Sequence, residues 1–558
     1  MIHKTHCLVP LLAAVAASTA PLAQAQTVPD AGRVQREAQP PTLQPPTAAL
    51  EIRLEPAMPE QTPPGGPKVT IRQVEFTGNT LISTEKLKAS LADQMGRSLD
   101  LAGLRAMAQQ VSALYQASGY PFARAFLLPQ TVQDGVIKLG VLEGRYGQVK
   151  AEGDTKLAAQ AQPFLQELKP GQVIETGQLS RSLLLLGDQP GIQVTPLVRP
   201  GQETGTGDLM VTVSPTPLVR VDAGYDNHGT RYTGANRVRF NAQFDSPFSL
   251  GDQVFARWVY SDGNLWLGSL SYGRPLGYSG LRMTANASRT AYWLGKDFAS
   301  LDASGTADTQ WLSLSYPLVR TTTANATLGA SLQRKQLRDI QRAVQTDERK
   351  SSQSLPLSLQ FDRRDDLGGS GITYGSVSWT VGDLRLQGQG LAADTASGRS
   401  AHGSFSKWNL DLARVQSLGS AGLSLFVRLS AQQANQNLDS SEKFSLGGPS
   451  GVRAFPIGEG NGDSGAYAQV ELRASMGAFS PYAFFDTGRA TLNARNGQLV
   501  APLATNSRSV AGAGAGVRFR QESWDLDGVV AHQTRGGAAQ SELGARATRA
   551  WVTVTYRF

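Results

Sequence analysis

Arg453 stands in a glycine-rich stretch, residues 445–465, which reads SLGGPSGVRAFPIGEGNGDSG and surrounds the arginine with Val452, Ala454 and Phe455. So much glycine and proline is unfavourable in a strand and typical of a loop. If such a loop is withdrawn from water, its arginine needs a carboxylate partner, because an unpaired buried charge is costly. The chemistry that these residues suggest is therefore an ion pair.

The next predicted strand, PYAFFDTGR (481–489), offers that carboxylate in Asp486. Two faces alternate along it, one with Tyr482, Phe484, Asp486 and Gly488, and one with Ala483, Phe485 and Thr487. The second face is apolar enough to contact lipid, so Asp486 would point inward in a closed sheet. We predict an Arg453–Asp486 pair that fixes the loop inside the sheet. An external loop with a solvated arginine is the alternative.

Patterns that would indicate an enzyme are weak. Ser83–Lys86 spells S-x-x-K but opens a predicted helix, and GAGAGV (512–517) lacks the Lys-Ser/Thr of a phosphate loop. The acidic residues of 458–465 have the wrong spacing for a full calcium ligand set. The five histidines show no paired metal-ligand spacing. We predict no catalytic activity, no metal and no cofactor.

Composition limits the class of protein. The 558 residues include 18% charged and 40% hydrophobic types, and no run of about 18 apolar residues occurs beyond the N-terminus. A membrane-spanning helix is therefore not expected. The net charge of +8 would suit an anionic surface, but over this length it fits an ordinary solvated basic surface equally well. No nucleic-acid partner is predicted.

The N-terminus has the pattern of a secretory signal peptide, residues 1–25. Lys4 precedes a short apolar core, and Ala23 and Ala25 fit the small-x-small cleavage rule. Cys7, the one cysteine, would leave with it, so an exported chain without disulfides needs another source of stability, such as a large sheet. Residues 26–67 form a proline-rich linker, within which 48–55 could be a short helix or strand.

Two mixed α and β segments follow the linker, residues 68–144 and 145–216. Each contains strand, helix, helix, strand and strand patterns, which indicates an internal repeat of one small module. A single larger α+β domain is the alternative.

Residues 217–558 lack helical patterns and alternate between apolar and polar types, as in NRVRFNAQFD (236–245). The charged polar face, the uneven connections and the terminal Phe558 favour a membrane β-barrel over a soluble sandwich. At about 21 residues per strand and connection, about 16 antiparallel strands are expected. Residues 439–466 would fold into the lumen. Tyr556 and Phe558 would form the barrel-assembly signal of the closing strand.

These motifs resemble a known family, the outer-membrane transporters of two-partner secretion, which include the haemolysin secretion/activation proteins. VRAF (452–455) is similar to the family's V-R-G-F/Y loop, with Ala454 where glycine is usual, and FFDTG (484–488) to its F-x-D-x-G strand. The resemblance implies that the two motifs meet in the lumen, as a clamp of Val452, Arg453, Ala454, Phe455, Phe484, Asp486 and Gly488. The two α/β segments resemble the family's paired POTRA domains. The family's N-terminal plug helix has one candidate, residues 48–55.

The resemblance implies a transporter in the outer membrane of a Gram-negative cell, with the POTRA domains in the periplasm. Its partners would be a secreted exoprotein with an N-terminal secretion domain, such as a haemolysin or adhesin, together with lipid and the barrel-assembly machinery. A barrel-assembly insertase of the same superfamily is the main alternative, although insertases usually carry more POTRA domains. A diffusive porin would need no tandem modules, and the charged inner faces argue against a secreted adhesin or enzyme.

Overall fold

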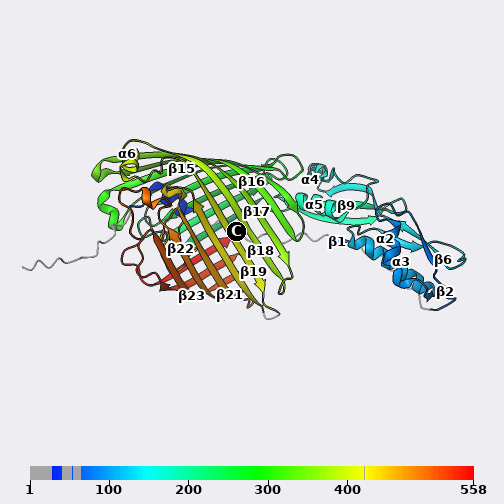
Figure 1. Ribbon diagram of the computed structural model, residues 1–558. Coiled ribbons are helices and arrows are strands. Elements are labelled where there is room, and N and C mark those ends of the chain that lie inside the picture. Colours follow the sequence, from blue (N-terminus) through cyan, green and yellow to red (C-terminus); the bar gives the residue numbers. More distant parts are fainter. Residues whose placement is uncertain (1–27, 40–52, 55–64, 420–421) are drawn as a thin grey trace, which may run out of the picture.

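A computed structural model describes residues 28–39, 53–54, 65–419 and 422–558 of the chain. It consists of a β-barrel and two small α/β modules that extend from one end of the barrel (Figure 1). The predicted signal peptide, residues 1–25, lies outside the described residues.

The barrel is a closed sheet of 16 antiparallel strands, as the alternation predicted. In chain order these are β10 (Val219–Asp226), β11 (Arg237–Asp245), β12 (Gln253–Ser261), β13 (Trp266–Pro275), β14 (Arg282–Trp293), β15 (Ala303–Arg320), β16 (Ala324–Gln341), β17 (Thr346–Asp365), β18 (Gly371–Leu386), β19 (Gly403–Ser417), β20 (Leu423–Ala434), β21 (Ser464–Ala474), β22 (Phe479–Thr491), β23 (Ser507–Gln521), β24 (Trp524–Arg535) and β25 (Thr548–Arg557). Each strand pairs with its sequence neighbours, and β25 pairs with β10 to close the ring.

Side chains alternate between two environments along these strands. Phe240 on β11 and Phe485 on β22 are 45% and 47% exposed, whereas Phe484 and Asp486 are buried. Large exposed apolar residues continue around the barrel, among them Trp258, Leu270, Leu314, Leu332, Leu359, Trp379, Leu429 and Leu472. Such a surface suits contact with lipid, while the charged residues turn to the inside.

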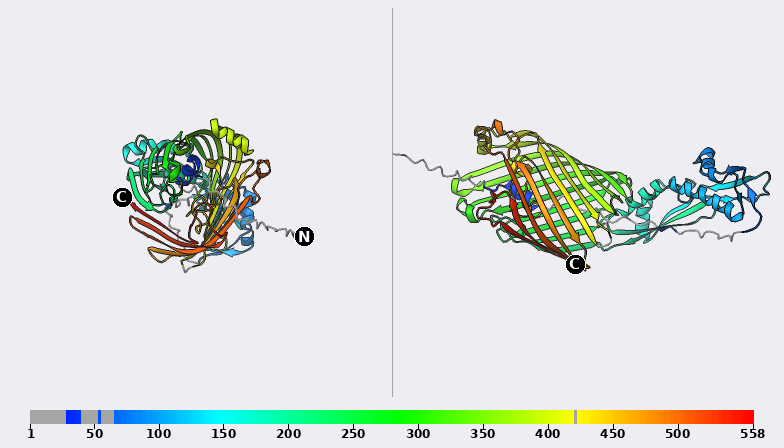
Figure 2. Two further views of the ribbon diagram at one scale, coloured as in Figure 1. Left: turned by 90° about the vertical axis from the view of Figure 1, so that its left-hand side faces the viewer. Right: turned by 60° about the horizontal axis from the view of Figure 1, so that its bottom comes forward.

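The barrel wall is taller on one side. Strands β15 to β17 have 18, 18 and 20 residues, whereas β10 to β12 have 8, 9 and 9. Twenty residues at about 3.3 Å each exceed the apolar band of about 25 Å even in a tilted strand. The tall side therefore extends beyond the membrane at the end away from the modules (Figures 1 and 2).

The first module comprises β2 (Val69–Thr70), β3 (Gln73–Thr77), α2 (Thr84–Ser90), β4 (Ser98–Leu99), α3 (Leu101–Ala117), β5 (Arg124–Leu127) and β6 (Val136–Leu142). Its main sheet has the order β3-β6-β5, and α3 packs against it through Leu104, Val111 and Tyr115. Ser83 accepts a hydrogen bond from the backbone N–H of Lys86 at 3.3 Å, so the S-x-x-K pattern is a helix N-cap.

One buried carboxylate orders the first module. Glu143 accepts hydrogen bonds from the backbone N–H groups of Thr80 and Leu81, at 2.5 and 2.8 Å, and from the Tyr115 hydroxyl at 3.3 Å. Burial, together with this carboxylate, raises the pKa of Tyr115 above its usual value. The tyrosine therefore stays neutral and holds α3 to the end of β6.

The second module comprises β7 (Arg145–Gly153), α4 (Thr155–Ala161), α5 (Thr176–Gly187), β8 (Ile192–Pro200) and β9 (Thr206–Pro215). Its sheet has the order β1-β8-β9-β7, because the two-residue strand β1 (Arg53–Leu54) of the linker adds to it. None of the described helices is long and apolar enough to cross a membrane.

The plug candidate, residues 48–55, lies mostly outside the described residues, and its described part, 53–54, forms the strand β1. Another part of the linker forms the helix α1 (Ala31–Ala38), which lies inside the barrel (Figure 2). The helix begins at Asp30, whose side chain accepts a hydrogen bond from the backbone N–H of Arg33. A helix of eight residues with few large apolar side chains shows no helical periodicity in the sequence. Asp30, a favourable N-cap residue, was the one sequence signal for its start.

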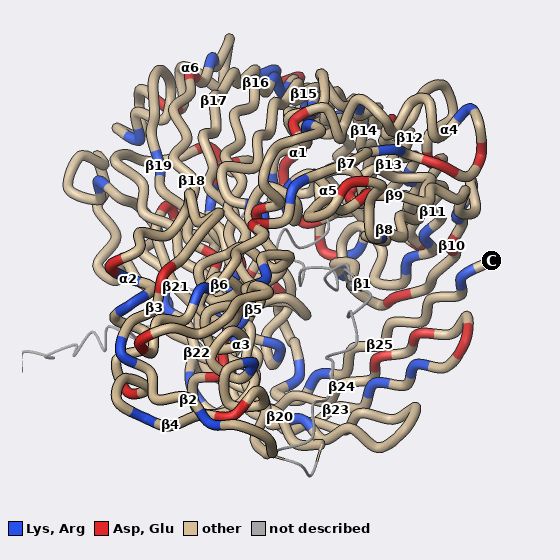
Figure 3. Tube along the Cα trace, turned by 90° about the vertical axis from the view of Figure 1, so that its right-hand side faces the viewer, with Lys and Arg blue, Asp and Glu red and all other residues tan. Residues whose placement is uncertain are grey.

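The second module is fixed to one side of the barrel rim (Figure 3). Asp188 after α5 binds Arg320 through two contacts of 2.7 and 2.5 Å. Leu250, in the turn between β11 and β12, packs into the core of the module, and its backbone N–H donates to Gln160 at 2.9 Å. Phe164 packs edge-on against Tyr278 of the next turn.

Candidate functional site

The loop that carries Arg453 lies in the barrel lumen. β20 ends at Ala434 and β21 begins at Ser464, so the loop is 435–463 instead of the predicted 439–466. The predicted end was too late because Ser464 already pairs with Thr491 of β22. Three residues of its tip, Val452, Ala454 and Phe455, are completely buried against the wall.

Arg453 makes a two-pronged ion pair with Asp486 of β22. Its Nε and Nη2 atoms lie 2.8 and 2.7 Å from the two carboxylate oxygens, and its backbone N–H donates to the same group at 3.1 Å. Asp486 is fully buried and Arg453 is 4% exposed. In this geometry the pair fixes both the position and the orientation of the loop tip.

A second carboxylate completes the arginine's environment. Glu471 of β21 accepts a hydrogen bond from Nη1 of Arg453 at 2.5 Å and also pairs with Arg473 and Arg518, at 2.7 and 3.2 Å. The guanidinium lies over the Phe484 ring, 3.6 Å from its centroid. Glu471 is not among the predicted site residues, although the alternation along β21 places it on the inner face.

The loop tip also contacts a third strand, β25. The indole Nε1 of Trp551 donates a hydrogen bond to the backbone carbonyl of Arg453 at 2.8 Å. Trp551 is not among the predicted site residues. The loop tip therefore joins the consecutive strands β21 and β22 to β25, which lies three strands later in the chain.

Two glycines of the wall make room for the loop. A Cβ atom at Gly488 would lie 2.9 Å from Leu446, so a side chain there would press on the loop. A Cβ atom at Gly512 would lie 2.3 Å from the Cβ of Ala454. Ala454 does not have a positive φ, so alanine fits the backbone at this position. GAGAGV (512–517) thus lies in β23, where Gly512 gives space to the loop.

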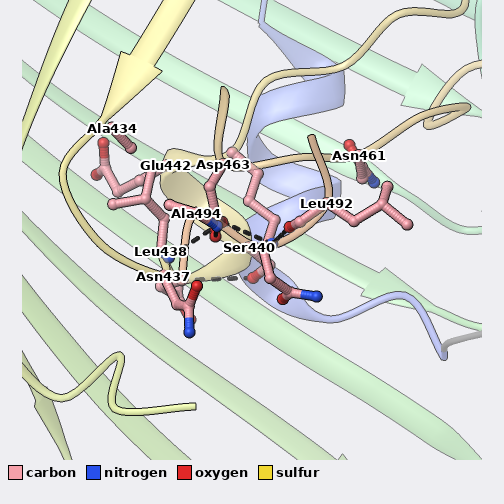
Figure 4. Close-up of polar contacts among 12 residues, drawn as sticks. Ala434, Asn437, Leu438, Ser440, Glu442, Asn461, Asp463, Leu492 and Ala494 are labelled. Atoms are coloured by element: carbon pink, nitrogen blue, oxygen red, sulfur yellow. Dashed lines mark hydrogen bonds and ion pairs between the residues drawn. The ribbon is translucent and has the colours of Figure 1, made fainter. Parts of the chain in front are cut away.

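The base of the loop is closed by Asp463 (Figure 4). Its carboxylate accepts hydrogen bonds from the backbone N–H groups of Leu438 and Ala494, at 3.0 and 2.8 Å, and lies 2.6 Å from Nζ of Lys443. The same Nζ donates to the carbonyl of Leu492 at 2.8 Å. Both ends of the loop are thereby joined to the neighbouring connection between β22 and β23.

The acidic residues of 458–465 hold basic side chains and backbone groups. Glu459 pairs with Arg508 of β23 at 2.7 Å and accepts the backbone N–H groups of Gln540 and Ser541, both at 2.9 Å. Within the described residues, no group of three or more His, Cys, Asp or Glu side chains is placed to hold a metal ion.

Helix α1 lies beside the loop, in the part of the lumen that is farther from the two modules (Figure 1). Lys350 of β17 lies 2.7 Å from Asp30 and 2.6 Å from Asp439, so one ammonium joins the helix cap to the loop. The backbone N–H of Ala31 donates to Asp339 at 2.8 Å, and Arg36 donates to Asn461 at 2.6 Å. The helix is thus held by the tall wall on one side and by the loop on the other.

A cavity of about 680 Å³ remains between α1, the loop and the wall. Nine lysine or arginine residues and five acidic residues line it, among them Arg36, Glu37, Asp226, Arg257 and Glu471. Such a charged lining is typical of a hydrated path and differs from the mostly apolar lining of small-molecule sites.

The predicted assembly residues lie at the closing seam. The backbone N–H of Phe558 donates to the carbonyl of Val221 of β10 at 2.9 Å. Tyr556 packs between Trp524 and Phe558, with ring centroids 4.8 and 5.0 Å away, and Phe558 is 76% exposed.

Comparison with known proteins identifies relatives of this architecture. Residues 205–519 match the family described as haemolysin secretion/activation protein ShlB/FhaC/HecB, and residues 69–144 match the ShlB-type POTRA domain. The heme/hemopexin transporter protein HuxB of Haemophilus influenzae is 26% identical over 463 residues, which cover 81% of each chain. The outer membrane transporter CdiB of Dickeya dadantii is 26% identical over 73% of this chain and 72% of its own.

A solved structure of CdiB from Escherichia coli has the same fold. It superimposes with a TM-score of 0.69 at 21% sequence identity, covering 91% of this chain and 94% of that one.

Proposed function

Because this chain belongs to the haemolysin secretion/activation protein family ShlB/FhaC/HecB and is an outer-membrane transporter of two-partner secretion, we propose that it exports one exoprotein through its barrel lumen. The cargo would be a large secreted protein such as a haemolysin or adhesin, recognised through an N-terminal secretion domain. The observation that carries the proposal is the lumen loop, whose tip is fixed by buried ion pairs beside a cavity lined with charged residues.

The periplasmic mouth supports a route into the lumen. A cavity of about 960 Å³ lies between the second module and the barrel rim, lined by Asp188, Arg220, Arg282 and Arg320 among others. The modules would bring an extended polypeptide to this mouth. Because the mouth is lined with charged residues, the backbone and charged groups of the polypeptide could remain solvated there. We infer that the cargo enters beside the second module and leaves at the tall end of the barrel.

Helix α1 and the loop would have different roles in this transport. The loop is fixed at its tip by Arg453, at its base by Asp463 and between them by Glu459, each fully or almost fully buried. Asp30, the cap of α1, is joined to the wall through Lys350. We propose that α1 is the plug that leaves the lumen and that the loop remains as part of the channel wall, with adjustments around Arg453.

The competing functions fit less well. A diffusive porin needs neither two periplasmic modules nor a buried Arg–Asp clamp. An insertase of the same superfamily shares the barrel, but the matched family consists of transporters, and residues 69–215 hold only two modules.

Export itself tests the proposal. The chain should be co-expressed with the exoprotein encoded beside it, and the exoprotein quantified in the medium and at the cell surface. Export that depends on this chain is the expected result. Export that proceeds equally without it, together with impaired assembly of other barrels in its absence, would favour an insertase.

Removal of Phe558 is expected to lower the amount of assembled barrel in the outer membrane. The deletion removes the Phe558–Val221 hydrogen bond and the aromatic contact with Tyr556 at the closing strand. Heat-modifiable mobility of the membrane-extracted protein measures assembly, and Phe558→Tyr, which keeps the ring, is the matched control. Equal assembly of the deletion and the parent protein would refute the role of this residue.

A further inference from the structure

The outward face of the tall wall changes from apolar to polar between two neighbouring rows of side chains. In the last apolar row, Leu312 of β15 pairs with Leu332 of β16, and these side chains are 44% and 64% exposed. Leu355 of β17 pairs with Val381 of β18 in the same row. The next outward row is polar, and its members pair in register across the four strands: Gln310, Arg334, Gln353 and Asp383. Both rows line a groove of about 720 Å³.

This boundary lies on the outer-leaflet side of the membrane. The turn between β15 and β16 is at the periplasmic end, because Arg320 beside it binds Asp188 of the second module. Arg334 lies toward the opposite end of β16. One row closer to the periplasm, Trp379 and Trp408 stack with ring centroids 6.0 Å apart and are 37% and 54% exposed. Exposed aromatic side chains are typical of the edge of the apolar band, so the polar row lies at the level of the lipid headgroups.

Beyond the apolar rows, the outward face of β14 to β18 carries more arginine than carboxylate. Its charged side chains are Arg289, Asp308, Arg334, Arg338, Asp347, Arg349, Asp383 and Arg385. Each carboxylate has an arginine partner: Asp308 pairs with Arg289, Asp383 with Arg385, and Asp347 with both Arg338 and Arg349. Two positive charges are therefore left without a carboxylate of their own.

The two surplus charges belong to Arg334 and Arg349. Arg334 is exposed and has no ion pair or hydrogen bond within the part of the chain that the structure describes. Arg338 binds both oxygens of Asp347, at 2.8 and 2.6 Å, which leaves Arg349 with one contact of 3.4 Å to the same group. Both guanidinium groups can therefore accept a further anion.

The spacing of these two arginines fits a ligand with two anionic groups. Gln353 lies opposite Arg334 and four residues from Arg349 on the same strand, so the two side chains are attached about 13 Å apart. Gln336 and Ser351 pair in register between them and offer an amide and a hydroxyl. A guanidinium binds phosphate through two parallel hydrogen bonds, and the polar side chains between the arginines suit sugar hydroxyl groups.

We propose that this face of β15 to β18 binds a glycolipid of the outer leaflet that carries two phosphates on a pair of sugars. Arg334 and Arg349 each bind one phosphate, Gln336 and Ser351 face the sugars, and the acyl chains lie over Leu312, Leu332 and Leu355. Charge complementarity and the continuous apolar surface below the arginines select such a lipid. This binding is independent of the export function proposed above.

Binding of bisphosphoryl lipid A to the purified full chain tests the proposal. The protein is titrated with this lipid in detergent micelles, and bound molecules are counted by native mass spectrometry. Arg334→Gln combined with Arg349→Gln is expected to weaken binding at least about tenfold, because two charge-assisted contacts are lost. Monophosphoryl lipid A is expected to bind the parent protein about tenfold more weakly than the bisphosphoryl form, since one contact is missing. Heat-modifiable mobility verifies that each variant is a folded barrel.

The matched control is Arg385→Gln on the same face. Arg385 is paired with Asp383, so this variant should bind bisphosphoryl lipid A as the parent protein does. Equal binding by the parent protein and the double variant would overturn the proposal. Phosphatidylglycerol that binds as tightly as bisphosphoryl lipid A would assign the face to any anionic headgroup and would also overturn it.

Discussion

Arg453→Ala is expected to abolish export while the barrel still assembles. The substitution leaves the fully buried Asp486 without its counter-charge, whereas Glu471 keeps Arg473 and Arg518. Removing one partner of a buried ion pair costs about 3–5 kcal/mol, because the remaining charge has no compensation. The loop tip would leave its position on β21, β22 and β25, whereas the barrel retains its own hydrogen-bond ladder. Export in the medium and heat-modifiable mobility measure the two effects separately.

Three variants sharpen this test. Arg453→Lys keeps the charge but cannot make the two-pronged contact, so export should fall between the parent protein and Arg453→Ala. Asp486→Asn should resemble Arg453→Ala. Arg385→Ala is the matched control, because the Arg385 side chain is 72% exposed and pairs with Asp383 near the end of β18. Export close to that of the parent protein in Arg453→Ala would exclude the clamp as a requirement.

Deleting residues 30–39 is expected to raise the ion conductance of the barrel several-fold. The deletion removes α1, whose Arg36 and Glu37 line the luminal cavity, while the loop keeps its anchors at Arg453, Glu459 and Asp463. Single-channel recordings of the purified protein in planar bilayers measure the conductance. Entry of large hydrophilic antibiotics into cells that express the variant gives an independent readout.

Point substitutions separate loss of the helix from loss of its attachment. Lys350→Met removes the ammonium that joins Asp30 to Asp439, so α1 should leave the lumen more often and open events should become more frequent at unchanged amplitude. Arg338→Ala on the neighbouring strand removes an exposed pair with Asp347 and should behave like the parent protein. Equal conductance of the parent protein and the deletion variant would show that α1 does not obstruct the channel.

The regular parts of this molecule were predictable because their patterns are long. Alternation over 342 residues predicted about 16 strands, and it placed Asp486 on the inner face of β22 opposite the glycine-rich loop. Alternation along β21 also puts Glu471 on the inner face, but it could not connect this residue to Arg453, because strand periodicity gives the face of a residue and not its partner across the lumen. Trp551 was missed for this reason too, since its contact is with the Arg453 carbonyl.

The irregular parts depend on tertiary contacts that no local pattern encodes. Helix α1 has eight residues and is held by Lys350, Asp339 and the loop, so its stability comes from its surroundings. The loop boundaries also depend on contacts, because Asp463 fixes Leu438 and Ala494 at the loop base. Strand β1 exists through its pairing with β8, which lies more than a hundred residues later in the chain.

The close approach of Ala454 to Gly512 has a consequence for how such sequences diverge. Between the loop and the wall there is room for one methyl group, and in this chain the methyl group of Ala454 occupies it, opposite Gly512. A transporter with glycine in the VRGF loop has that space free, so its wall position can carry alanine, whereas alanine on both sides would place two carbon atoms about 2.3 Å apart. The two positions are therefore expected to covary, and ancestors of this chain would have acquired the wall glycine before the loop alanine.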